Sequence, residues 1–241
     1  MNNGITAGAS PEPLREYPPI GHNTASPVMR AAAKGVSILF HPVFVPVYVM
    51  AFLLYIHPFL FAGFSSHNKM LVLVQSILMM TFFPLVTVLL LKGVGFIKSV
   101  YLRTQRDRVI PIIACMTWYF WIAYVWRNMG KSNDTVPMPR EIVYLAAAMF
   151  LTTVLALMIN ITMKVSLHAI AVGVALTFLF QLAITENVNF AVYLSVAILV
   201  TGLVCTARLI ASDHTQREVY TGLLTGVAAM AAAPALIGLL G

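Results

Sequence analysis

The chain has 241 residues, of which 60% are hydrophobic and only 10% are charged, and its mean hydropathy is +0.87. Soluble globular domains carry about 25% charged residues, so this composition excludes an ordinary water-soluble domain and indicates a polytopic membrane protein. The formal net charge of +7 does not indicate a nucleic-acid partner, because the basic residues lie in short loops between apolar segments. Their expected partners are membrane lipids or an anionic ligand.

Residues 1–34 are polar, contain Pro, Gly and Ser, and lack the apolar stretch of a secretory signal peptide. We expect them to form a flexible tail. Residues 35–241 are then expected to form one transmembrane helical domain.

Seven apolar segments follow the tail, and a membrane-spanning helix needs about 20 mostly apolar residues. They are expected to be helical, because an isolated strand could not pair its backbone groups in lipid. The expected fold is therefore an all-α polytopic membrane helical bundle. Pro42, Pro46 and Pro58 predict kinks or a break in the first span. The seven spans are predicted at residues 36–64, 70–91, 109–126, 142–163, 169–184, 190–210 and 219–240.

Counting seven spans places the tail and the loops after the second, fourth and sixth spans on one membrane face. Ionisable side chains at a hydrocarbon boundary are costly to keep, which makes them candidates for a site. Three polar clusters lie on this face: Lys98, Arg103, Arg106 and Arg108; Lys164, Ser166 and His168; and Arg208, His214 and Glu218. Their convergence predicts a composite site.

The residue types in these clusters indicate phosphoryl chemistry. His214 and Glu218 are spaced i,i+4, so a carboxylate can fix one ring nitrogen and leave the other as a nucleophile or base. Arginine offers a planar fork for phosphate oxygens, and Lys164 adds a compact positive charge. His168, at the start of another helix, is a candidate acid for a leaving oxygen.

Each of these residues also has a structural interpretation. Thr215 and Glu218 fit a capping box, so Glu218 could serve only to cap the last helix. Arg208 and Lys164 could be ordinary interfacial side chains, and the three arginines after the second span could only set topology. Either histidine alone is more often structural than catalytic.

Other polar residues within the apolar segments favour no cofactor. A haem or metal role for His41 and His57 lacks a second ligand pair with convincing spacing, so no metal site is expected. Asn160 is interpreted as a hydrogen bond between helices.

The third cluster resembles the third motif of the type 2 phosphatidic acid phosphatase superfamily, the integral-membrane lipid phosphatases related to haloperoxidases. That motif runs Ser-Arg, five residues, His, three residues, Asp. Here Ala207-Arg208 precedes His214 by five intervening residues, and Glu218 follows after three more. The spacing matches, with Ala in place of Ser and Glu in place of Asp.

The other two clusters resemble the family's remaining motifs in order and position. The second motif, Pro-Ser-Gly-His, is matched by Ser166 and His168, with Leu167 in place of the glycine. The first motif, Lys, six residues, Arg-Pro, is met in chemistry but not in register, by the three arginines before Pro111. Which arginine acts is therefore open. The resemblance covers about residues 70–225.

The resemblance implies a metal-independent, cofactor-free, acid-phosphatase-type lipid phosphatase, which is a phosphoric ester hydrolase. His214 would attack phosphorus to form a phosphohistidine, Glu218 would hold His214, and His168 would protonate the leaving lipid alkoxide. The implied phosphate-binding residues are Arg208, Ser166, Lys164, Arg103, Arg106 and Arg108. The substrate would be a phosphomonoester or diphosphate of a phospholipid or polyprenyl lipid. The family's six-helix core would correspond to spans two to seven, with one extra N-terminal span.

Two other functions remain open: a non-catalytic protein that binds or transports lipid phosphates on the same fold, and a lipid phosphotransferase. The expected location is the cell (inner) membrane. The face with the clusters carries eleven of the fifteen Lys and Arg residues, which favours the cytoplasmic side. If the five proposed phosphate ligands among them are left out, six Lys and Arg residues remain on this face and four lie on the opposite face. The sequence does not indicate an oligomeric state.

Overall fold

The computed structural model describes residues 25–57, 59–97, 105–131, 137–186, 189–211 and 214–240, which form helices and turns with no strand among them. Six helical stretches within these ranges are long and apolar enough to cross a membrane. The predicted all-α polytopic membrane bundle is thus confirmed. The six stretches are Ser66–Gly93, Gln105–Asn128 (α5), Arg140–Ile159 (α6), Leu167–Thr185 (α7), Ala191–Ile210 (α8) and Gln216–Leu239 (α9).

The first of these stretches is not a uniform α-helix. It consists of α3 (Ser66–Ser76), a π-helical turn η1 (Ile77–Phe82) and α4 (Phe83–Gly93). Pro84 stands near the start of α4 and has no N–H to donate to the preceding turn, which accounts for the irregular hydrogen bonding there.

The N-terminal part of the chain differs from the sequence prediction in two ways. The predicted boundary between tail and domain at residues 34 and 35 falls inside helix α1 (Pro27–Leu39), which Ser26 caps. The predicted first span, 36–64, is not one helix, because a turn after Phe40 separates α1 from α2 (Val45–Tyr55). Pro42 lies in this turn, and Pro46 occupies the first turn of α2, where proline is tolerated.

The segment around α2 nevertheless runs along α7. His41 contacts His168 in the first turn of α7, whereas His57 pairs with Glu186, which caps the other end of α7. The 11 residues of α2 alone extend about 16 Å, shorter than the roughly 30 Å of a hydrocarbon core. Only with its flanking turns does this segment match the length of α7.

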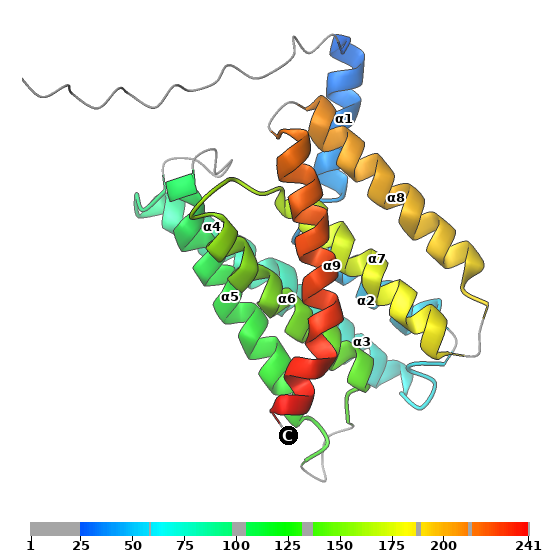
Figure 1. Ribbon diagram of the computed structural model, residues 1–241. Coiled ribbons are helices and arrows are strands. Elements are labelled where there is room, and N and C mark those ends of the chain that lie inside the picture. The colour runs from blue at the N-terminus through cyan, green and yellow to red at the C-terminus, as the bar shows by residue number, and fades with distance from the viewer. Residues whose placement is uncertain are drawn as a thin grey trace, which may run out of the picture.

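Helix α9 lies across the centre of the bundle, with α5 and α6 on one side and α7 and α8 on the other (Figure 1). It packs against both α6 and α7. The approach to α7 is close because glycines face it: a Cβ at Gly222 would lie 2.6 Å from the Ser166 carbonyl oxygen, and one at Gly226 would overlap the Ile170 carbonyl. Small residues at this spacing let helix backbones approach in membranes. The first turns of α7 and α9 are thereby held together.

We predict that Gly226→Ala lowers the free energy of unfolding by about 2 kcal/mol or more, because the new methyl group overpacks the contact between α7 and α9. Gly202→Ala is the matched control, since a Cβ at that position in α8 meets nothing within 4 Å. Alanine there should be neutral or stabilising by about 0.5–1 kcal/mol. Denaturation of the two purified variants in detergent measures the difference. Equal stability of the variants would contradict the close approach.

Candidate functional site

Described residues from each of the three polar clusters meet at one end of the bundle. The buried Arg108 side chain, from the first turn of α5, donates from Nη1 to the carbonyl oxygen of Val165 at 2.8 Å. The backbone N–H of Ser166 donates to the carbonyl oxygen of Glu218 at 3.2 Å. These two bonds join the start of α5, the loop before α7 and the first turn of α9. The connections that were predicted to share a membrane face are therefore in contact.

His214 precedes α9 and is bonded to Glu218 within the first turn of that helix. Its Nδ1 lies 2.8 Å from Glu218 Oε2, and the His214 side chain is only 4% exposed. A carboxylate accepts, so Nδ1 donates a proton and Nε2 keeps the lone pair of the neutral ring. This geometry leaves His214 Nε2 as a nucleophile or base.

Glu218 has two roles at once. Its Oε2 also accepts the backbone N–H of Thr215 at 3.1 Å, while Thr215 Oγ1 accepts the backbone N–H of Glu218, which completes a capping box. The sequence alone offered capping or histidine binding as alternatives. In the structure one carboxylate oxygen does both, because the residue before the cap is the histidine.

The surroundings of His214 favour its neutral form. Burial lowers the pKa of His214 from 6.5 to about 4, and the positive charges of Arg208 and Arg108 act in the same direction. The hydrogen bond and the negative charge of Glu218 oppose this shift and do not outweigh it. Burial disfavours a charged ring, and the two arginines add a positive potential that disfavours a cation further.

Arg208 stands in the last turn of α8 and is 8% exposed. Its Nη1 donates to the Ser37 hydroxyl at 3.2 Å. His41 packs edge-to-face on His168, with ring centroids 5.4 Å apart. Partial removal of His41 from water lowers its pKa, although the residue as a whole remains exposed, and the charge of Arg208 adds to the effect. Arg208 thus lies close enough to act on both His41 and His214.

His168 and Ser166 fix the start of α7. The carbonyl oxygen of Ser37 can only accept, so His168 Nε2 donates to it, at 2.9 Å. The Ser166 hydroxyl, fully buried, accepts the backbone N–H of Ala169 at 3.4 Å as the N-cap of α7. Ser166 was predicted as a phosphate ligand, and in the structure its hydroxyl caps the helix that carries His168.

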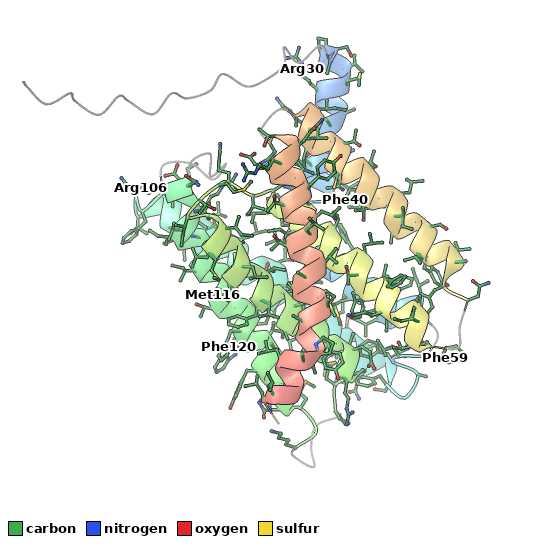
Figure 2. The ribbon with its side chains drawn as sticks, in the orientation of Figure 1. Arg30, Phe40, Phe59, Arg106, Met116 and Phe120 are labelled. Carbon is green, nitrogen blue, oxygen red and sulfur yellow. The ribbon has the colours of Figure 1, made fainter. Side chains whose placement is uncertain are left out.

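The described arginines before Pro111 differ in their burial. Arg108 is 8% exposed and its charge acts on His214. Arg106 is exposed at the outer edge of the bundle, beside the start of α5 and away from α9 (Figure 2). The predicted role of Arg106 as a phosphate ligand therefore has no support from its position, because the helix turns it outward. Arg103 and Lys98 lie outside the described residues.

The loop before α7 contains Lys164 and is tied to α5 through Asn160. Lys164 is partly buried two residues before Ser166. Asn160 Nδ2 donates to the backbone carbonyl of Gln105 at 2.8 Å, so the expected hydrogen bond between helices is confirmed. This bond joins the end of α6 to the start of α5, the helix that carries Arg108.

Two contributors were not predicted from the sequence: Ser37 in α1 and His41 in the turn after it. Both contact His168, and Ser37 also contacts Arg208. In the sequence they are a serine and a histidine four residues apart, next to a proline in an apolar segment. This pattern alone indicates no chemistry. Among the described residues, no group of three or more His, Cys, Asp or Glu side chains is arranged to hold a metal ion.

An apolar groove of about 220 Å³ lies between α2, α7 and α8. Its walls include Phe40, Tyr48, Val172, Ala175, Ala197 and Val200. Val172 is one helical turn from His168, and Phe40 precedes His41 at the end of α1 that meets the bundle (Figure 2). Val45 and Val172, which line the groove, also pack with Val204 in one apolar cluster. The groove therefore ends next to the site.

No family model matches the chain, and no curated protein or solved structure shows significant similarity to it. Any function has to be inferred from the side chains of the site and their contacts.

We predict that the His214 ring titrates near pH 4 instead of 6.5, so that the neutral nucleophilic form is present above about pH 4 and is lost as the pH falls through that value. Glu218→Gln should move the midpoint lower still, because the carboxylate favours the protonated ring. NMR titration of the histidine ring signals measures both midpoints, with the His214 signal assigned by its loss in His214→Gln. A midpoint near 6.5 in the unsubstituted protein would contradict the burial of the ring.

Proposed function

We propose that the chain is an integral-membrane lipid phosphatase that hydrolyses a phosphate ester through a phosphohistidine at His214. The observation that carries the proposal is the orientation of His214. Its Nδ1–H is held by Glu218, its Nε2 lone pair is available, and two arginine side chains place positive charge around it. The positive charges of Arg208 and Arg108, which add to the lowering of the His214 pKa by burial, would also favour an anionic substrate such as a phosphate.

In the proposed first step, His214 Nε2 attacks phosphorus and the P–O bond to the lipid breaks. The electron pair stays on the lipid oxygen, which takes a proton from His168, and the negative charge of the bound phosphate would favour the protonated ring that this transfer needs. Glu218 stabilises the Nδ1–H of the phosphorylated ring, while Arg208 and Arg108 bind phosphate oxygens. In the second step water attacks phosphorus, His168 accepts its proton, and inorganic phosphate leaves His214. Neither step requires a metal ion or an organic cofactor.

A lipid substrate, not a soluble one, is favoured by the membrane setting and by the groove. The groove between α2, α7 and α8 is lined almost wholly by apolar side chains and ends one helical turn from His168. A hydrocarbon chain there would leave its phosphate at the polar cluster. The proposal covers phosphomonoesters and diphosphates of phospholipids or polyprenyl lipids. We place the site on the cytoplasmic face of the cell membrane, from the distribution of Lys and Arg.

A non-catalytic lipid-phosphate-binding or transport protein is the second candidate. It is favoured by Leu167, which stands where the related motif has glycine, and by the use of the Ser166 hydroxyl as a helix cap. Trapping a covalent phosphohistidine from a labelled lipid phosphate separates the two candidates, since a binding protein forms none. Product analysis in the presence of an alcohol acceptor separates hydrolysis from phosphotransfer.

We predict that His214→Ala abolishes both phosphate release and phosphohistidine formation, with a fall in rate of at least about 10³-fold, as expected for loss of a covalent nucleophile. The assay is phosphate release by purified protein from phosphatidate, phosphatidylglycerophosphate and polyprenyl diphosphate. The control is His67→Ala, since His67 is an exposed histidine in the first turn of α3. Retained activity in a folded His214→Ala protein would rule out His214 as the nucleophile.

We further predict that Ala175→Phe, which fills the groove, raises KM for a long-chain lipid phosphate by about tenfold or more, the size expected for lost burial of a few methylene groups. The KM for the small soluble ester p-nitrophenyl phosphate should stay unchanged. Val192→Phe is the control, because Val192 is 70% exposed on α8 and does not line the groove. A parallel change for both substrates would argue against the groove as the site of the lipid chain.

A further inference from the structure

Ser37 contacts two of the residues that the proposed mechanism places on the phosphate. It lies on α1, outside the three clusters, and is 7% exposed. Its carbonyl oxygen is 2.9 Å from His168 Nε2, and its hydroxyl oxygen is 3.2 Å from Arg208 Nη1. The two oxygens of one residue thus bind the candidate acid and a candidate phosphate ligand.

The contact with His168 determines which ring nitrogen can exchange a proton with substrate. A carbonyl oxygen has no proton to give, so His168 Nε2 carries the hydrogen and Nδ1 has the lone pair in the neutral ring. In the protonated ring, the proton that can be transferred is then the one on Nδ1. A backbone carbonyl on one nitrogen holds the ring in place while the other nitrogen reacts, as in sites where histidine is a ligand or a base.

The contact with Arg208 has a defined direction as well. The Ser37 hydroxyl donates to the backbone carbonyl of Ala33, 2.9 Å away within α1. Its lone pairs are therefore turned to the Arg208 N–H group, which can only donate. The chain of bonds runs from Arg208 to Ser37 to Ala33 and limits the orientations of the guanidinium plane.

Helix α1 is fixed on the bundle near Ser37. Ala33 packs with Ala207 and Ala211 at the end of α8, on either side of Arg208 in sequence. His41, one turn beyond Ser37, packs its ring on His168. Figure 1 shows α1 extending past the bundle at the end where α8 ends and α9 begins. Ser37 thus occupies the part of α1 that is docked on the site.

We propose that Ser37 is a positioning residue of the phosphate site: its carbonyl sets His168 to exchange protons through Nδ1, and its hydroxyl orients Arg208 for phosphate. This inference rests on the proposed phosphatase function and extends it to the N-terminal helix. If Ser37 instead occupied the positions of the phosphate oxygens and inhibited the site, its removal would lower KM or raise kcat.

The first test is steady-state kinetics of Ser37→Ala in the full chain. Loss of one hydrogen bond to a charged group should raise KM for the lipid phosphate about tenfold, with a smaller change in kcat. Ser37→Cys keeps nearly the same volume but offers a weaker acceptor, so it should show a similar rise. Ser195→Ala is the matched control, because Ser195 makes the same type of backbone bond in α8 but is exposed. Its KM should not change.

Three kinetic results would overturn the proposal. An unchanged KM in Ser37→Ala means that the hydroxyl does not orient Arg208. A wild-type KM in Ser37→Cys means that the side-chain volume alone matters. A lower KM or a higher kcat in Ser37→Ala means that Ser37 inhibits the site.

The second test does not depend on a variant that folds well or on catalysis. The ¹⁵N shifts of the ring nitrogens in histidine-labelled, unsubstituted protein report which nitrogen of His168 carries hydrogen, with the signal assigned by its loss in His168→Gln. The expected form has the proton on Nε2, and a proton on Nδ1 would overturn the proposal. If the protein releases no phosphate yet shows the Nε2–H form, the phosphatase function fails while the Ser37 contact stands.

Discussion

The close contact between α7 and α9 holds the candidate site together, since the two proposed catalytic histidines stand at the starts of these two helices. Glycines on both helices bring the backbones near enough for the Ser166 N–H to reach the carbonyl of Glu218. A side chain at Gly222 would push apart the residue that caps α7 and the first turn of α9. The distance between His168 and His214 is therefore set within the membrane, by residues that take no part in chemistry.

Electrostatics complements this packing. Two buried arginines and a buried histidine share one end of the bundle, and their charges are costly at a hydrocarbon boundary. Part of the cost is relieved by hydrogen bonds to Val165, Ser37 and Glu218, and part by keeping His214 neutral. The phosphate ester proposed as substrate would suit such a positive environment.

The sequence predicted six of the seven helical spans and the contact between residues of the three polar clusters, because the length of an apolar segment and the parity of its ends follow from the order of residues alone. It also predicted the pairing of His214 with Glu218, since i,i+4 spacing brings side chains together on any helix. It could not choose among the arginines before Pro111, because the one that faces the bundle depends on where α5 begins and how it packs against α6. It missed Ser37 because the sequence around a serine that bonds its own helix does not indicate whether a distant arginine also donates to that serine. The break after Phe40 was anticipated from the prolines, but not that helix α1 begins at Pro27.

The contact between Arg208 and Ser37 joins residues 171 positions apart, and His214 precedes the final helix. The candidate site therefore joins α1 to the end of α8 and the start of α9, and it is complete only when α9 is in place. Helices inserted earlier would carry Ser37 and His168 into the membrane without His214. Only the arrival of α9 would bring His214 to its neighbours. Until α9 packs against α7, the candidate site would thus lack His214 and Glu218, whatever its function.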